Sequence, residues 1–185
     1  MRYFFGFIAV IVLLILVSIL VFKGFKGNGG PAAAQVNLLN YATTNTVMQL
    51  TIDGPITADQ THQGIRIDVG QYYNTMSVYQ GYNNNVTSSQ TFNNNPNSYA
   101  VFLRALDLLG FTKGNTNPAL ADSRGYCPTG ERYIYEIQTN GVDSQKFWSA
   151  TCNGEGNFSG DSVDIRNLFD AQIPDYATIA NGTAL

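Results

Sequence analysis

Histidine, cysteine and charge are all scarce in this sequence, and each shortage narrows the chemistry that it can support. His62 is the only histidine among 185 residues, and no Gly-x-Ser-x-Gly, Ser-x-x-Lys or His-Glu-x-x-His motif occurs. Catalysis by an activated serine or by a zinc-bound water therefore has no recognisable set of residues. No glycine-rich phosphate loop follows a strand pattern. We expect no catalytic residue, no metal ligand and no cofactor.

Three further features of the sequence bear on that expectation. His62 lies in the polar stretch 59–63 ahead of a strand pattern, and we expect a solvated loop side chain. Asn153, Glu155 and Asn157 alternate with glycines but do not match a calcium loop, so a turn explains them better. Thirteen acids offer many carboxylate pairs, so an envelope hydrolase that uses two carboxylates stays as a third-ranked function.

The low charge content also restricts the partners. Charged residues make up 12% of the chain, about half the usual share. From Gly27 onward, seven lysines and arginines stand against thirteen acids. A negative domain of this kind is poorly suited to nucleic acid or to an anionic lipid surface.

One long hydrophobic run stands at the start of the chain. Tyr3 to Phe22 contains twenty residues without a charge, which as a helix would be about 30 Å long and match the apolar thickness of a bilayer. The run is about twice the length of the apolar part of a signal peptide. We therefore expect a transmembrane anchor over 1–23, a flexible Gly- and Pro-rich linker over 24–35 and one globular domain over 36–185. The bilayer itself would be the partner of Tyr3–Phe22.

The two cysteines predict a disulfide and, with it, a location. Cys127 and Cys152 flank two strand patterns joined by Asn140-Gly141, a strong hairpin signal. If those two residues form the turn, Cys152 lies opposite Thr129, close enough to Cys127 for a bridge across the open end of the hairpin. Two free buried thiols are the alternative. Because disulfides persist outside the reducing cytosol, we expect a single-pass membrane protein with its C-terminal domain outside the cytoplasm.

Period-two and period-3.6 patterns together predict an α+β domain. The expected meander strands are followed by a helix that Asn97 or Ser98 caps, that runs to about Leu109 and that stops at Gly110, with Val101 in its apolar face. The hairpin comes next, and then a second helix from about Ser162 to Gln172 with Asp161 at its start. We predict an antiparallel sheet, formed by a meander of about four strands plus the disulfide-closed hairpin, with two helices packed on one face. Thr51 and Arg66 fall on the polar sides of the first two strand patterns, and the fourth, rich in Ser, Thr and Gln, is expected near an edge of the sheet. The strand patterns cover 47–52, 65–69, 75–79, 86–92, 132–139 and 142–151.

Tyrosines gather around the second and third predicted strands. Tyrosine provides stiff contact area, and the surrounding asparagines and glycines provide adaptable hydrogen bonding, a mixture typical of recognition loops. Ordinary strand-edge tyrosines are the alternative. The candidate binding residues are Tyr72, Tyr73, Tyr79 and Tyr82.

The first residues carry one family resemblance. Gly6-Phe7, the apolar run after them and a domain with a C-terminal disulfide resemble a type IV pilin, which implies processing before Phe7 and assembly into a filament. Pilins usually carry glutamate at the fifth position after the glycine, where this chain has Ile11, and here 27–31 interrupts the helix. The resemblance covers only the first twenty-two residues and one general feature of the domain.

The sequence favours a membrane-anchored, extracytoplasmic domain of a cell envelope with a non-catalytic binding or scaffolding role. Its partner would be an envelope protein or glycan, and not nucleic acid. A pilin-like subunit of a surface filament is the alternative.

Overall fold

A computed structural model describes residues 37–152, 154–183 and 185. It confirms the α+β class: the strands come in two runs along the chain, separated by a long helix and followed by two shorter ones. The elements are η1 (Leu38–Tyr41), β1 (Thr46–Asp53), β2 (Gln63–Val69), β3 (Tyr73–Gln80), β4 (Asn85–Asn93), α2 (Pro96–Leu109), η2 (Pro118–Leu120), β5 (Arg132–Thr139), β6 (Val142–Ala150), α3 (Ser162–Asp170) and α4 (Tyr176–Ala180).

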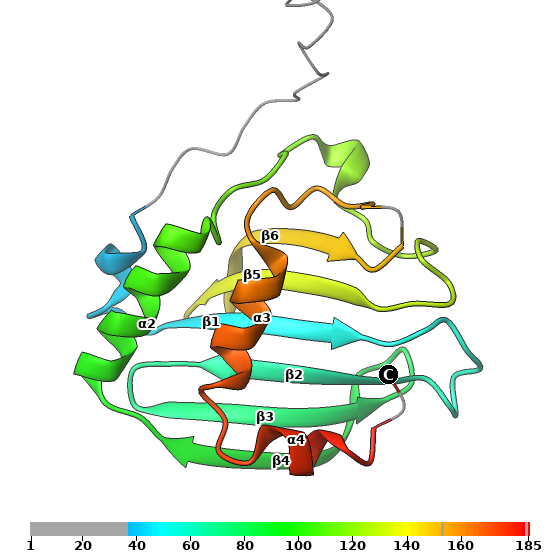
Figure 1. Cartoon of the computed structure of the whole chain (residues 1–185), viewed down its shortest axis with the longest axis horizontal. Coiled ribbons are helices and arrows are strands. Elements are labelled where there is room, and N and C mark those ends of the chain that lie inside the picture. Colours follow the sequence, from blue (N-terminus) through cyan, green and yellow to red (C-terminus); the bar gives the residue numbers. More distant parts are fainter. Residues whose placement is uncertain (1–36, 153, 184) are drawn as a thin grey trace, which may run out of the picture. The chain divides into compact units, whose positions relative to one another are not determined.

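All six strands belong to one antiparallel sheet with the order β4-β3-β2-β1-β5-β6. The predicted meander forms β1 to β4, and the predicted hairpin joins it because β5 pairs along the whole of β1. Figure 1 shows α2, α3 and α4 on the same face of this sheet. That face carries the apolar alternate residues of the strands, so the hydrophobic core lies between the sheet and the helices.

The hairpin forms as predicted, with one change in register. Asn140 and Gly141 both have positive φ, 53° and 77°, which is the conformation that a two-residue turn requires and that this residue pair tolerates. Thr139 lies opposite Val142, but the register shifts between Ile137 and Gln138. The disulfide between Cys127 and Cys152 is confirmed.

The first long helix differs from its predicted start and apolar face. Asn95, rather than Asn97 or Ser98, is the N-cap, because Pro96 needs no hydrogen-bond partner at the first helical position. Gly110 ends the helix as predicted. Val101, expected on the apolar face, is exposed because it lies two positions, about 200° around the helix, from the buried Tyr99 and Leu103. The buried residues are Tyr99, Phe102, Leu103 and Leu106.

The C-terminal part contains one more helix than expected. Asp161 caps α3 through a hydrogen bond from the backbone N–H of Asp164, as predicted. The short helix α4 follows, and the sequence pattern did not predict it. The predicted membrane span Tyr3–Phe22 lies outside the described residues. Within the described part, none of the helices has the length and apolar composition to cross a bilayer.

Asp170, at the end of α3, makes the stability of the domain depend on pH. Burial raises the pKa of this carboxyl group to about 6 despite the nearby charge of Arg166, and its Oδ1 atom has no hydrogen-bond partner among the described residues. Below about pH 4 the raised pKa does not change the free energy of unfolding, because this carboxyl group is protonated in both the folded and the unfolded chain. The fold then loses stability as the pH rises to about 6.

We therefore expect Asp170→Asn to stabilise the domain at neutral pH. Allowing for solvent screening of this partly exposed group, the gain at pH 7 is about 1 kcal/mol. Urea unfolding at pH 4, 5, 6 and 7 should show a smaller loss of stability with pH than in the wild type. The matched control is Asp107→Asn on the exposed side of α2. An unchanged pH profile for Asp170→Asn would contradict the effect.

Candidate binding site

The face of the sheet without helices carries polar side chains from every strand. The antiparallel register aligns them in three rows that run across the strands. The central row, from β6 to β4, contains Trp148, Ile134, Thr51, Arg66, Ser77 and Ser89. The Glu136 row contains Lys146, Glu136, Gln49, Asp68, Thr75 and Thr91. The Asp53 row contains Ala150, Arg132, Asp53, Gly64, Tyr79 and Val86.

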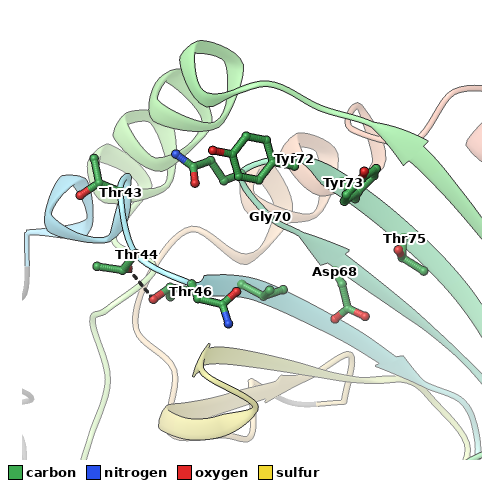
Figure 2. Close-up of a pocket in the computed structure, with 11 residues that line it drawn as sticks. Thr43, Thr44, Thr46, Asp68, Gly70, Tyr72, Tyr73 and Thr75 are labelled. Atoms are coloured by element: carbon green, nitrogen blue, oxygen red, sulfur yellow. Dashed lines mark hydrogen bonds between the residues drawn. The ribbon is translucent and has the colours of Figure 1, made fainter.

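Two of the predicted binding tyrosines, Tyr72 and Tyr73, lie at the turn between β2 and β3. Both are exposed, and they line a hollow of about 360 Å³ together with Asp68, Thr75 and the residues before β1. Figure 2 shows Tyr73, Thr75 and Asp68 on neighbouring strands beside this hollow. The hollow therefore shares Asp68 and Thr75 with the Glu136 row.

The other two tyrosines, Tyr79 and Tyr82, lie at the opposite end of β3. Tyr79 is 3% exposed, and its hydroxyl group donates to Asp53 Oδ1 at 3.0 Å. Burial raises the pKa of Tyr79. Gly64 makes this position possible, because a Cβ atom there would lie 2.1 Å from the tyrosine hydroxyl. Tyr82 remains half exposed, so the four tyrosines do not form one patch, and their binding role stays a prediction.

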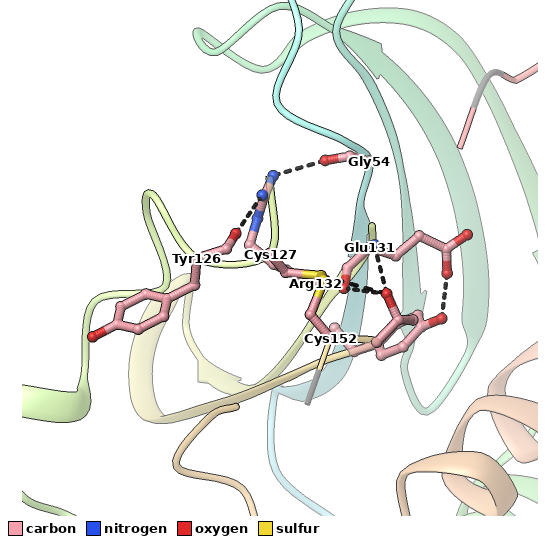
Figure 3. Close-up of a disulfide and its surroundings, with 8 residues drawn as sticks. Gly54, Tyr126, Cys127, Glu131, Arg132 and Cys152 are labelled. Carbon is pink, nitrogen blue, oxygen red and sulfur yellow. Dashed lines mark hydrogen bonds between the residues drawn. A yellow bond between two sulfur atoms is a disulfide. The ribbon is translucent and has the colours of Figure 1, made fainter. Parts of the chain in front are cut away.

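Asp53 is the centre of a buried hydrogen-bond network. Arg132 donates to Asp53 Oδ2 from Nε at 2.9 Å and from a terminal nitrogen at 2.6 Å. The same guanidinium group donates to the carbonyl groups of Gly54 and Tyr126, as Figure 3 shows. Since Arg132 is 2% exposed, this network fixes the end of β1 to β5 and to the segment before the disulfide.

His62 belongs to the same network, and its expected solvent exposure is wrong. The ring is 1% exposed. Its Nε2 lies 2.8 Å from Asp53 Oδ1 and its Nδ1 lies 3.0 Å from the carbonyl oxygen of Pro55. Tyr82 stacks on the ring with centroids 4.2 Å apart. Both nitrogens face protein acceptors, so neither is presented to a ligand.

The Glu136 row is also internally paired. Gln49 donates to Asp68 Oδ1 at 2.6 Å, and Lys146 forms an ion pair with Glu136 at 2.8 Å. Burial raises the pKa of Asp68, while the Gln49 hydrogen bond and the charge of Arg66 lower it. Farther along the face, Thr75 pairs with Thr91, and in the central row Ser77 pairs with Ser89 through side-chain hydroxyls.

A groove of about 700 Å³ lies over the part of these rows that β1, β2, β5 and β6 contribute, with Tyr79 at its side. The β1, β2 and β5 side chains form its floor, and the segment Ala121–Arg124 forms one wall. Trp148 holds this segment in place, because its Nε1 donates to the carbonyl oxygen of Leu120 at 2.7 Å and its ring packs against Tyr126. Tyr82 lines the opposite side. The groove is therefore shaped mainly by strand residues with fixed positions.

Two groups on the groove floor have no partner within the described part of the chain. Arg66 Nε and Thr51 Oγ1 are both inaccessible to solvent and make no hydrogen bond. The two residues face each other across the β1–β2 pair. The sequence patterns placed both residues on the polar side of their strands, but nothing in the sequence marked them as a pair.

The groove shows no arrangement of the usual metal ligands. Among residues 37–152, 154–183 and 185, no three histidine, cysteine or acidic side chains converge as a metal site would require. Glu155 and Asn157 are described and Asn153 is not, and the Asn157 side chain accepts from the backbone N–H of Trp148. No protein-family model matches the chain, and no curated protein or solved structure was found to be significantly similar to it.

Proposed function

We propose that this chain is a non-catalytic binding module of a cell envelope that captures a polar ligand on the helix-free face of its sheet. The observation that carries the proposal is the groove over the three rows. Several polar groups on its floor, among them Gln49, Asp53 and Glu136, are held in place by hydrogen bonds or ion pairs. Rigid polar groups lose little conformational entropy when a ligand binds, which favours recognition.

The composition of β3 and β4, the strands beside the groove, indicates what kind of ligand would fit. No charged residue occurs between Asp68 and Arg104, so β3 and β4 offer hydroxyl and amide groups rather than charge. Tyr82 adds an exposed aromatic side chain at the rim. Hydroxyls, amides and one aromatic ring suit an envelope polysaccharide better than an apolar peptide.

The remaining features support tethering outside the cytoplasm. The apolar run Tyr3–Phe22 has the length of a membrane span. A disulfide-bonded domain fits an oxidising compartment. A single-pass anchor followed by a linker would hold the groove within reach of envelope polymers.

Blocking the groove tests the proposal. Ser77 lies beside Arg66 in the central row, so Ser77→Trp would place an indole ring against the side of the groove that Arg66 lines. Ser88→Trp is the matched control, because Ser88 lies on the neighbouring strand opposite Val78 and outside the three rows. Full-length protein in a sugar-free detergent is incubated with insoluble envelope polysaccharide, and the retained fraction is measured after sedimentation.

We expect the wild type and Ser88→Trp to be retained equally and Ser77→Trp to lose at least tenfold in affinity. Circular dichroism checks that both variants are folded. Equal retention of the two variants, or no retention of the wild type, would contradict a polysaccharide-binding face.

A further inference from the structure

We infer that Arg66 and Thr51 form a subsite for the carboxylate group of an acidic saccharide. This inference rests on the proposed function and specifies the ligand class for the same groove. It is carried by two unpartnered polar groups that lie side by side in the central row. It requires a negative charge on the ligand, which the proposed function does not.

Arg66 is the first of the two groups. The described residues give its guanidinium group no hydrogen bond and no ion pair, and its one contact of note is with the Tyr79 ring, 5.9 Å away. Asp68 interacts with it electrostatically but forms no ion pair. The buried Nε–H group is costly, because it loses water without gaining an acceptor. A ligand that supplies acceptor oxygens would remove this cost.

The other cations in the groove or beside it are already paired with carboxylates. Arg132 is paired with Asp53, Lys146 with Glu136, and Arg124 with Asp122. An anionic ligand group would have to displace an existing carboxylate at any of these positions. At Arg66 it would meet a planar guanidinium group that no carboxylate of the described residues holds. The paired N–H groups of a guanidinium match the two oxygens of a carboxylate.

Thr51 is the second group and an independent one. It is 5% exposed, and its hydroxyl oxygen has no partner within the described part of the chain. Since Thr51 is aligned with Arg66 in the β1–β2 register, their side chains lie on the same face at neighbouring positions. A hydroxyl donor beside a guanidinium group provides hydrogen-bond donors for the two oxygens of one carboxylate group.

The surrounding charges favour a carboxylate over a phosphate. Asp53 and Asp68 lie on either side of the central row, in the adjacent rows, and would repel a second negative charge. The hydroxyl pair Ser77–Ser89 continues the row beyond Arg66, which suits the hydroxyl groups of a sugar. An extended peptide is less suitable, because the strands under the groove already use their backbone groups in the sheet.

The subsite can be tested with matched acidic and neutral sugars. Full-length protein in a sugar-free detergent is applied to an array of uronic-acid, sialic-acid and muramic-acid oligosaccharides, each printed beside its methyl ester. The variants are Arg66→Gln, Arg66→Lys and Thr51→Val. Arg104→Gln, an exposed arginine on α2, is the matched control.

We expect at least one acidic form to bind at least tenfold more tightly than its ester. Arg66→Gln should remove this preference, Thr51→Val should weaken it by about threefold to tenfold, and Arg66→Lys should restore part of it. Arg104→Gln should behave as the wild type.

Equal binding of acid and ester forms, with Ser77→Trp still blocking both, would overturn the carboxylate subsite and leave the proposed function standing. Binding that survives Ser77→Trp would overturn both. If no acidic form binds, the carboxylate subsite is wrong.

Discussion

Arg132→Met should lower the free energy of unfolding by about 3 to 4 kcal/mol, because it removes one partner of a buried ion pair and leaves Oδ2 of Asp53 without its arginine. The arginine side chain is 3% exposed and that of Asp53 is 20% exposed. Four hydrogen bonds of the guanidinium group, to Asp53, Gly54 and Tyr126, are lost together. Urea unfolding at pH 7 measures the change.

The chain provides a matched control for this variant. Arg124 also donates to a carboxylate, that of Asp122, from its Nε and a terminal nitrogen at 2.6 to 3.0 Å. Its side chain, however, is 89% exposed. Arg124→Met should therefore leave the unfolding curve unchanged within error, because solvent screens exposed ion pairs. Similar effects of the two variants would mean that burial does not determine the strength of the Asp53–Arg132 pair.

Replacing both cysteines with serine should cost about 3 kcal/mol, since the bridge closes a loop across a sequence separation of 25 residues and restricts the unfolded chain. The loss should also loosen one wall of the groove. Cys127 follows Tyr126, whose carbonyl group accepts from Arg132 (Figure 3). Gly130 packs beneath the bridge, where a Cβ atom would lie 2.7 Å from Cys127 Sγ.

Thermal unfolding measures the disulfide effect, and a fall in Tm of about 10 °C is expected for a domain of this size. Hydrogen exchange should be faster in the segment Ala121–Arg124 of the serine variant than in the wild type. The helix α2, on the other face of the sheet, serves as an internal reference. Unchanged exchange in the loop would contradict a role of the disulfide in shaping the groove.

The sequence was sufficient to predict most of the fold because the strongest patterns are local. Alternation in β1, β2 and β3 and the Asn140-Gly141 turn each depend on a few adjacent residues. The edge position of β4 followed from its Ser-, Thr- and Gln-rich sequence in the same way. The short α4 was missed because five residues carry too little periodicity to predict a helix.

The candidate site was not predictable in the same way, because its contacts are made between strands. His62 was expected in solvent, but Asp53 and Tyr82 bury it from the end of β1 and the loop after β3. Tyr79 was grouped with recognition tyrosines, whereas the missing side chain of Gly64 lets its hydroxyl reach Asp53. Thr51 and Arg66 become neighbours only through the register of β1 and β2.

The central claim, that the helix-free face binds the ligand, is tested most directly by mapping a bound polysaccharide fragment on the protein. Full-length protein labelled with ¹⁵N in a sugar-free detergent is titrated with a soluble fragment of the retained polymer, and amide chemical shifts are followed. A binding face over the three rows predicts the largest shifts at Thr51, Arg66 and Ser77. Shifts concentrated instead around the hollow between α2 and α3, lined by Val101, Phe102 and Leu168, would contradict it.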